Sequence, residues 1–294
     1  MRPLVFALPP SERFADALAG KLDAERGKIE LHRFPDGETS LRLLTDCQER
    51  EVIVVATLID PDPKLLPLAL LTQTARELGA ARVRLVTPYL AYMRQDKRFR
   101  PGEAVSNRIF ARMLSELADE LWTFDAHLHR VASIDDLFDI PAHNLHAAPA
   151  LSDWIANNID RPLLVGPDEE SQQWVQDVAE RAGAPFTVLR KERHGDYDVR
   201  ITLADPNVDR TRQPVLVDDI ISTARTMAET ANILQSLGLR APVAVAVHGL
   251  FAGDALHALR KAGVNRIVTS NTVPGPFAEI DVTPMLAEAL DAGP

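Results

Sequence analysis

Short apolar runs alternate with helix-length amphipathic segments along the whole chain, and this alternation restricts the possible folds more than any other feature. Residues 51–56 and 82–87 have the length and β-branched composition of buried strands. A helical pattern over residues 65–78 lies between them and ends before Gly79. Strand–helix–strand order of this kind is typical of parallel sheets with helices on both faces. The sequence therefore predicts an α/β fold.

The same order of elements returns in the second half of the chain. A strand is expected at residues 214–217, a helix over 224–237 that ends before Gly238, and another strand at 243–247. This recurrence favours two copies of one αβ unit.

The length of 294 residues is sufficient for two domains, each with its own core. The stretch 139–149 is loop-like in composition, so we place the boundary there, giving an N-terminal domain of residues 1–146 and a C-terminal domain of residues 147–294. The last helix is a candidate for packing back on the N-terminal domain.

Charge and composition exclude several classes of function. The formal net charge is -10, from 32 Lys and Arg against 42 Asp and Glu, and such a field repels nucleic-acid backbones. The apolar runs are far shorter than the roughly 20 residues that a membrane span needs. Cys47 is the only cysteine, so an intrachain disulfide and a cysteine-based zinc site are both excluded. We expect a cytoplasmic protein that binds neither nucleic acid nor membrane.

The most specific motif begins where the strand ending at Val217 runs into Asp218 and Asp219. Ligands of parallel sheets bind at the carboxyl ends of strands. The turn at residues 222–226, rich in hydroxyl groups, opens a helix and predicts an anion site, and the paired carboxylates suit vicinal sugar hydroxyls. The structural alternative is a helix N-cap at Ser222 or Thr223 beside two strand-end aspartates.

A basic segment runs from Arg94 to Arg112, with six Lys and Arg against Asp96 and Glu103. In an acidic chain this local excess favours a phosphate-bearing ligand. A solvated helix face is the alternative.

Three further loops carry candidate residues. Asp168 follows the strand that ends near Gly166, and it either faces a metal or sugar or belongs to an acidic first helical turn. Lys191 and Arg193 lie in a charged segment between two strand-like runs, which is also common at hairpin tips.

Asp125 and His127 follow the strand over 121–124 in a D-x-H-x-H pattern. This pattern either contributes to a metal site or is only a loop. The chain has no G-x-x-x-x-G-K-[ST] and no G-x-G, so a P-loop and a dinucleotide fingerprint are both excluded.

Taken together, these loops resemble the ribose-phosphate pyrophosphokinase family over nearly the whole chain, with the closer similarity to its archaeal-type branch. The resemblance implies two tandem domains of the type I phosphoribosyltransferase kind, each a mainly parallel sheet flanked by helices. It also implies an Mg²⁺-dependent diphosphotransferase that moves the β,γ-diphosphoryl group of ATP to O1 of ribose 5-phosphate, yielding 5-phospho-α-D-ribose 1-diphosphate and AMP. A homo-oligomer is implied as well, because a neighbouring subunit contributes to each ATP site.

The family's functional residues carry over to matching positions of this sequence. The catalytic loop corresponds to Lys191 and Arg193. The ATP-binding residues implied by the resemblance are Phe34, Asp36, Gly37, Glu38, Arg94, Gln95, Asp96 and His127. Those implied for ribose 5-phosphate are Asp168, Asp218, Asp219, Ser222, Thr223, Ala224, Arg225 and Thr226. The implied metal-site residues are His127 and Asp168, with Asp125 as a further candidate.

The phosphate loop departs from the family pattern at Arg225, where many members have glycine. A side chain there either adds a cation toward the phosphate or points away from it. Two other functions stay open: a phosphoribosyltransferase that consumes the diphosphate product, and a catalytically silent regulatory subunit.

Overall fold

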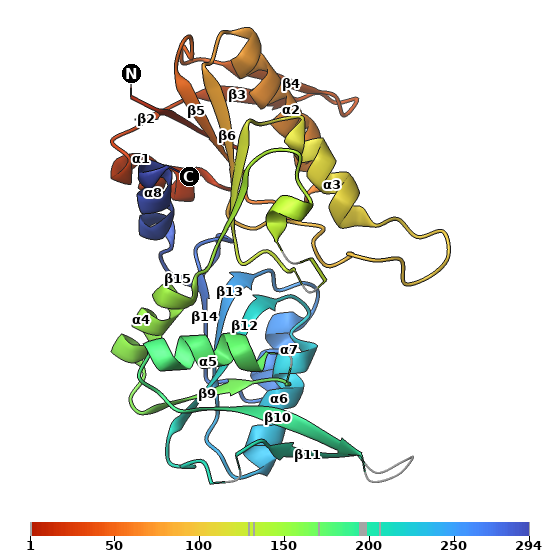
Figure 1. The fold of residues 1–294 in the computed structure, drawn as a ribbon, viewed down its shortest axis with the longest axis vertical. Helices are drawn as coiled ribbons and strands as arrows, with labels where there is room; N and C mark the ends of the chain where they lie inside the picture. The colour runs from red at the N-terminus through yellow and green to blue at the C-terminus, as the bar shows by residue number, and fades with distance from the viewer. Residues whose placement is uncertain are drawn as a thin grey trace. The chain divides into compact units, whose positions relative to one another are not determined.

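The computed structural model describes residues 2–128, 130–131, 133–169, 171–193, 199–205 and 207–293, with the backbone alone at 191–193 and 199–201. The chain divides into two compact units (Figure 1). The first unit comprises residues 1–145 together with 282–294, and the second comprises residues 146–281.

The first unit is built on a six-stranded sheet in which every strand pair is parallel, in the order β2-β1-β5-β6-β7-β8. These strands are β1 (Leu4–Ala7), β2 (Glu25–Arg26), β5 (Glu51–Val55), β6 (Arg82–Thr87), β7 (Glu120–Phe124) and β8 (Ala142–Leu145). The unit also contains an antiparallel hairpin of β3 (Ile29–Arg33) and β4 (Thr39–Leu43).

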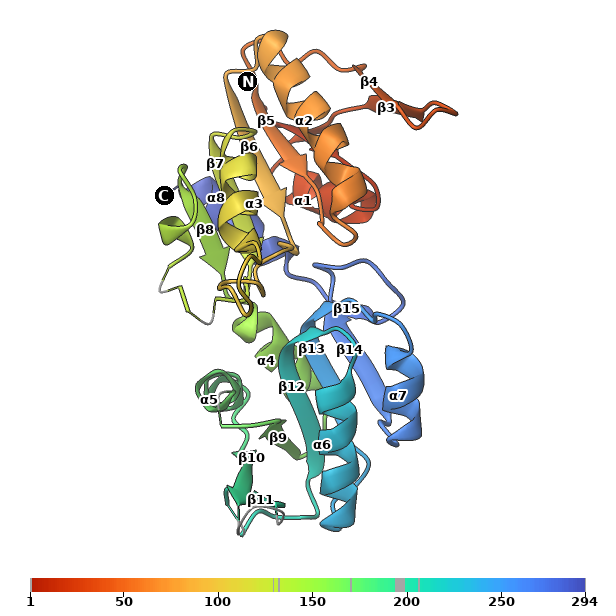
Figure 2. The same cartoon turned by 90° about the vertical axis from the view of Figure 1, so that its right-hand side faces the viewer.

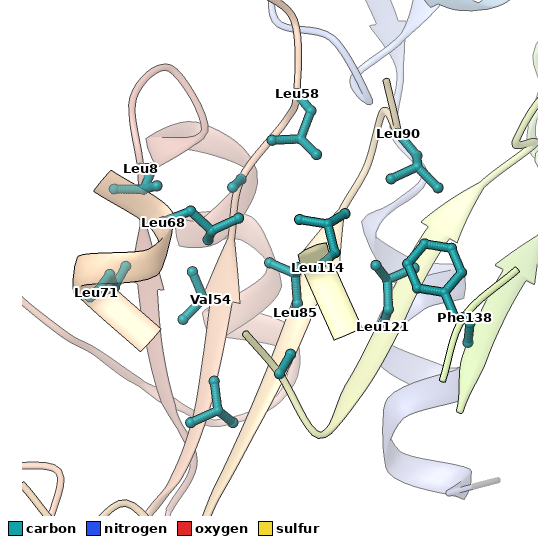
Figure 3. Close-up of a cluster of buried hydrophobic side chains, with 14 of the residues drawn as sticks. Leu8, Val54, Leu58, Leu68, Leu71, Leu85, Leu90, Leu114, Leu121 and Phe138 are labelled. Carbon is teal, nitrogen blue, oxygen red and sulfur yellow. The ribbon is translucent and has the colours of Figure 1, made fainter. Parts of the chain in front are cut away.

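Helices cover both faces of this sheet. They are α1 (Glu12–Lys21), α2 (Asp62–Glu77), α3 (Ser106–Ser115) and α8 (Thr283–Ala292), with a short 3-10 helix η1 (Ile134–Asp136). Helices α2 and α3 lie on one face, and α1 and α8 lie side by side on the other (Figure 1). A core of leucines, with Val54 and Phe138, fills the space between the sheet and helices α2 and α3 (Figure 3).

The second unit has a seven-stranded sheet in the order β11-β10-β9-β12-β13-β14-β15, parallel except for the pair of β10 and β11. Its strands are β9 (Pro162–Gly166), β10 (Phe186–Arg193), β11 (Val199–Leu203), β12 (Gln213–Ile221), β13 (Val243–Gly249), β14 (Arg266–Ser270) and β15 (Ala278–Ile280). Its helices are α4 (Ala148–Asn158), α5 (Gln172–Arg181), α6 (Arg225–Ser236) and α7 (Ala255–Lys261). Helices α4 and α5 cover one face, and α6 and α7 the other (Figure 1).

The α/β prediction with two strand–helix–strand units is confirmed, since β5-α2-β6 and β12-α6-β13 each join parallel neighbours. One local prediction is wrong. The stretch 139–149 is not a loop throughout, because β8 and the first residues of α4 lie within it. Strand β8 includes the polar residues His143 and Asn144, which an edge strand tolerates and which concealed it in the sequence.

A buried charge network lies at the amino-terminal ends of the first unit's strands, away from the edge where ligands bind. The Glu120 side chain is fully buried and contacts Arg82 at 3.0 Å, Arg84 at 2.8 Å and His143 at 2.9 Å. Arg84 also contacts Glu51 at 2.7 Å. Removing one member of such a network leaves a buried charge without its partner, so we interpret it as structural.

Candidate active site

The paired aspartates of the second unit lie within β12, not after it. The sequence predicted a strand ending at Val217, but β12 continues to Ile221 because β13 extends alongside it, pairing Asp218 with Ala246 and Ile221 with Gly249. The backbone amide of Asp219 donates to the Asp218 carboxylate at 2.9 Å. The two carboxyl groups therefore meet at the carboxyl-terminal part of a central strand, where ligands of parallel sheets bind.

Burial raises the pKa of Asp218 well above its usual value of 3.8. Repulsion from Asp219, a side-chain hydrogen bond with Asp219 and the charge of Asp168 raise it further. The charges of Asp219, on β12, and of Asp168, in the loop after β9, therefore act on the buried Asp218 carboxyl group. A ligand that brings hydroxyl donors or positive charge to this position would relieve the repulsion.

Residues 222–224 connect β12 to α6, whose first residues are Arg225 and Thr226, and carbonyl groups at this junction accept hydrogen bonds from the loop after β13. The Ile221 carbonyl accepts from the amides of Leu250 at 2.9 Å and Phe251 at 3.1 Å, and the Ser222 carbonyl accepts from Ala252 at 3.0 Å. Ala224 precedes the helix with φ 58° and ψ 13°, a left-handed conformation that is costly for a residue with a Cβ. The loop is thus held in a specific conformation at the helix N-terminus, which suits an anion.

Arg225 points to a carboxylate of the neighbouring loop. Its Nη2 donates to both oxygens of Asp254, at 2.7 and 3.0 Å. Both side chains are more than half exposed. The sequence left open whether Arg225 points toward a phosphate or away from it, and the structure directs its guanidinium to Asp254.

Asp168 closes the turn between β9 and α5. The amide of Ser171 donates to the Asp168 carboxylate at 3.0 Å, and the Ser171 hydroxyl donates to the Asp168 carbonyl at 2.7 Å. Glycine is required at position 166 because an added Cβ would lie 2.5 Å from the Ser171 hydroxyl and 3.0 Å from Val188. The predicted transition from a strand into a helix is therefore correct here.

Lys191 and Arg193 lie in the last residues of β10, where it pairs with β11 as an antiparallel hairpin. Their register partners are Ile201 and Val199. The side chains of both residues lie outside what the structure describes, so their roles stay predictions.

In the first unit, Arg94, Gln95 and Asp96 follow β6, and the amide of Asn107, at the start of α3, donates to the Gln95 carbonyl at 3.4 Å. The Arg94 side chain is exposed, and the Asp96 carboxylate is 5% exposed. Farther along the loop, the Glu103 carboxylate accepts from the amides of Phe99 and Arg100, both at 2.9 Å. The basic segment thus contains an ordered turn before α3 begins.

His127 and Asp125 lie in the loop after β7, the neighbour of β6 in the sheet. The amide of Asp125 donates to the Leu145 carbonyl at 2.8 Å, and the amide of Ala126 donates to the Asn144 side chain at 2.8 Å. This loop is therefore fixed to the end of β8. Parallel pairing of β6 and β7 brings the loops after them to the same edge of the sheet.

The segment from Phe34 to Glu38 forms the turn of the β3–β4 hairpin, which extends away from the rest of the first unit (Figure 2). The Phe34 amide donates to the Glu38 carbonyl at 2.8 Å, and Gly37 has φ 95°, which favours glycine. The Asp36 carboxylate accepts from the Glu38 amide at 3.1 Å. The Phe34 ring is 44% exposed, although aromatic rings are usually buried.

No group of three or more His, Cys, Asp or Glu side chains in the described part of the chain is arranged to hold a metal ion by itself. Mg²⁺ seldom needs such a group, because it is usually bound through one or two carboxylates together with substrate phosphates and water. Asp168, Asp218 and Asp219 are carboxylates of the kind that this mode of binding uses. His127 belongs to the first unit and Asp168 to the second.

The sequence-predicted residues of each unit therefore lie at the carboxyl ends of its parallel strands, except for the hairpin turn at 34–38 and for Lys191 and Arg193 in the β10–β11 hairpin. Two residues that enter these contacts were not singled out by the sequence. Arg130 pairs with Asp96, and Asp254 pairs with Arg225. Each pair joins loops that are distant in the chain, and nothing in the local sequence signals it.

Comparison with known proteins gives the family. Residues 4–117 match the N-terminal domain of ribose phosphate pyrophosphokinase, and residues 133–273 match the phosphoribosyl transferase domain. A ribose-phosphate pyrophosphokinase from Methanopyrus kandleri is 37% identical over 291 residues, which is 98% of each chain. The chain belongs to the ribose-phosphate pyrophosphokinase family.

Other relatives agree with this assignment. A ribose-phosphate pyrophosphokinase of Methanosarcina acetivorans is 36% identical over 285 residues, covering 96% of this chain and 97% of its own. The predicted similarity to archaeal members of the ribose-phosphate pyrophosphokinase family is confirmed. The crystal structure of phosphoribosylpyrophosphate synthetase from Mycobacterium smegmatis superposes with a TM-score of 0.83 at 23% identity, covering 99% of this chain and 98% of that one. This likeness confirms the predicted fold.

Enzymes of this family are kinase-like transferases that generally depend on a metal, and the family substrates are ATP and ribose 5-phosphate. No helix among the described residues is both long and apolar enough to cross a membrane.

Proposed function

We propose that this chain transfers the β,γ-diphosphoryl group of ATP to O1 of ribose 5-phosphate, forming 5-phospho-α-D-ribose 1-diphosphate and AMP. The observation that carries the proposal is the 37% identity to a curated ribose-phosphate pyrophosphokinase across 98% of both chains. The loops at the carboxyl ends of the strands support it, because they contain the acidic, basic and hydroxyl side chains that this chemistry needs.

The second unit binds ribose 5-phosphate. Asp218 and Asp219 accept hydrogen bonds from vicinal sugar hydroxyls, as paired carboxylates at the end of a central strand can. The loop at 222–226 binds the 5-phosphate through the N–H groups at the start of α6. Asp168 completes the sugar side of the site.

The first unit binds ATP. Arg94 supplies positive charge at the end of β6, Gln95 supplies hydrogen bonds, and His127 approaches from the neighbouring loop. The turn at residues 34–38 binds the adenine of an adjacent subunit, a role to which the exposed Phe34 ring is suited.

Mg²⁺ is the metal that we propose, and its candidate ligands are Asp168 in the second unit and His127 in the first, with Asp125 as a further candidate in the first. When bound, it would neutralise negative charge on the phosphates. The residues of the chain position O1 of the sugar and orient the polyphosphate.

In the reaction, O1 attacks the β-phosphorus, a new O1–phosphorus bond forms, and the bond from the β-phosphorus to the oxygen of the α-phosphate breaks. AMP leaves with that oxygen, and the O1 proton passes to solvent. Lys191 and Arg193 stabilise the charge that develops on the transferred group, as positioned cations do in phosphoryl transfer.

We further propose a homo-oligomer that works in the cytoplasm. Two observations support the oligomer: Leu31, Phe34 and Leu44 are exposed on or beside the hairpin, and Ile109 and Met113 are exposed one helical turn apart on α3. Measurement of the mass in solution tests this assembly, and a purely monomeric active enzyme would contradict it.

A coupled assay for AMP tests the proposed reaction. Purified protein is incubated with ATP and Mg²⁺, with and without ribose 5-phosphate. We expect AMP to appear only when the sugar phosphate is present. Folded protein that releases no AMP would contradict the proposal and favour a phosphoribosyltransferase or a silent subunit.

A further inference from the structure

An ion pair joins two loops of the first unit that the sequence treats separately. Nη1 of Arg130 donates to both carboxylate oxygens of Asp96, at 2.9 and 3.0 Å. The Asp96 side chain is 5% exposed, whereas the Arg130 side chain is 51% exposed. An ionised carboxylate in so buried a position requires a partner, and Arg130 is that partner.

The pair lies at the ligand-binding edge of the sheet. Asp96 belongs to the loop after β6 and Arg130 to the loop after β7, and these two strands are parallel neighbours. Both loops are anchored nearby, since the Gln95 carbonyl accepts from the Asn107 amide and the Ala126 amide donates to Asn144. Arg130 is therefore held by a fixed carboxylate and lies three residues after His127.

The chemistry of the pair separates the roles of its two members. Both oxygens of Asp96 are occupied by Arg130, and a carboxylate would in any case repel a polyphosphate. Arg130 uses only Nη1 for this contact, and the described residues give its other nitrogen atoms no hydrogen-bond partner. A half-exposed guanidinium, held on one side by a buried carboxylate, presents its remaining N–H groups as a fork suited to phosphate oxygens.

We propose that Arg130 binds the polyphosphate of ATP and that Asp96 is a positioning residue that holds Arg130 in place. This inference rests on the proposed function, which places ATP at the same edge of the sheet. It changes the role expected for Asp96, because the carboxylate acts on ATP through Arg130 and not by direct contact.

The test compares Arg130→Ala, Asp96→Asn and the control Arg161→Ala. Arg161 is a suitable control because it is also about half exposed and pairs with a carboxylate, Asp209 at 2.6 Å, in the second unit. Calorimetry measures ATP binding to each protein in Mg²⁺, and steady-state kinetics gives KM for ATP and for ribose 5-phosphate.

We expect Arg130→Ala to weaken ATP binding and to raise KM for ATP by roughly tenfold to a hundredfold, the scale of hydrogen bonds to charged groups. KM for ribose 5-phosphate should stay within about twofold. Asp96→Asn should shift KM for ATP in the same direction by a smaller factor, because Arg130 remains but is less well fixed. The control should match the unsubstituted enzyme.

Unchanged ATP binding in folded Arg130→Ala would overturn the inference. Loss of thermal stability in both variants without a change in KM for ATP would also overturn it, since the pair would then only join the loops. If the unsubstituted protein binds ATP but forms no AMP with ribose 5-phosphate, the proposed function fails while the role of Arg130 in ATP binding can still be measured. If it binds no ATP, both fail.

Discussion

At the scale of single residues, ion pairs between residues far apart in the sequence fix charged side chains in both candidate sites. Arg225 departs from the family pattern in the phosphate loop, yet the structure directs its guanidinium to Asp254. The left-handed residue of the loop is Ala224, whereas Arg225 is the first residue of α6, so position 225 does not require glycine. The departure therefore adds a contact between loops and leaves the backbone path available to an anion.

Substitution of Arg225 by glycine should have only a small effect on the use of ribose 5-phosphate. An exposed ion pair contributes at most about 1 kcal/mol, so we expect KM for ribose 5-phosphate to rise by about fivefold or less. Asp254→Asn should produce a similar change, which steady-state kinetics can compare directly. A rise of a hundredfold in Arg225→Gly, with Asp254→Asn unaffected, would show direct contact between Arg225 and the phosphate.

Asp218 should cost stability at neutral pH. Burial and the neighbouring carboxylates raise its folded-state pKa above the usual 3.8, so the native state binds more protons than the unfolded state between these two pKa values. The stability present below about pH 4 is therefore lost as the pH rises through the folded-state pKa.

Asp218→Asn removes this cost. We expect the free energy of unfolding at pH 7 to increase by on the order of 1 kcal/mol, while activity falls roughly tenfold to a hundredfold. Denaturant unfolding at pH 4 and pH 7 measures the effect, and the gain over the unsubstituted protein should be larger at pH 7. A variant that is less stable at pH 7 than the unsubstituted protein would contradict this prediction.

At the scale of elements, two antiparallel hairpins accompany the parallel sheets: β3–β4 forms a sheet of its own, and β10–β11 extends the sheet of the second unit. The β3–β4 hairpin holds Phe34 at its turn, with the ring edge-on to His32 at a centroid distance of 4.7 Å. The β10–β11 hairpin holds Lys191 and Arg193 near the end of β10. Hairpins can place functional side chains outside the packed core, so such residues can be replaced without a large loss of stability.

Phe34→Ala should leave the melting temperature nearly unchanged, because the ring is already largely exposed. If Phe34 stacks on the adenine bound by a neighbour, KM for ATP should rise about tenfold or more. Mixing this variant with Lys191→Ala should restore some activity, because a mixed oligomer can form one intact shared site. Absence of any restoration after exchange of subunits would contradict a shared site.

Lys191→Ala should lower kcat roughly 10²- to 10³-fold, the scale expected when one preorganised charge stabiliser is removed. Binding of ATP and of ribose 5-phosphate should change much less, because the cation acts on charge that develops during transfer. Rapid-mix measurement of a single turnover separates the two effects. Near-normal turnover would show that Lys191 does not have this role.

The elements of the parallel sheets could be predicted well from the sequence, and the functional contacts less well. The apolar run at residues 51–56 matches β5 because burial of both faces leaves a continuous β-branched signal. The end of β12 was missed because its ladder with β13 continues through polar residues. Ion pairs such as Arg130 with Asp96 depend on which strands are neighbours, and local patterns carry no information about this.

At the scale of the whole molecule, the chain returns to its first unit at the end. Helix α8 packs beside α1, and the Leu290 carbonyl accepts from Arg84 of β6 at 3.4 Å. The last residues therefore complete a unit that the first half of the chain begins. Stability of the first unit should depend on side chains near residue 290.

Leu286→Ala tests this dependence, since Leu286 is fully buried in α8. Truncation of a buried leucine costs about 2–5 kcal/mol. Hydrogen exchange should show faster opening of the peptides of β5 and β6, whereas exchange in β12 and β13 should stay unchanged. The control Glu288→Ala, an exposed position on the same helix, should not change the exchange of either unit. Equal destabilisation of both units would contradict the assignment of α8 to the first.

The central claim is that the diphosphoryl group moves intact from ATP to O1 of ribose 5-phosphate. Phosphorus NMR of the reaction in Mg²⁺ follows every phosphate at once. The account predicts loss of the three ATP signals and, in equal amounts, growth of AMP and of a diphosphate coupled to the sugar's anomeric carbon. The appearance of ADP or of free diphosphate, or a ribose 5-phosphate signal that does not change, would contradict it.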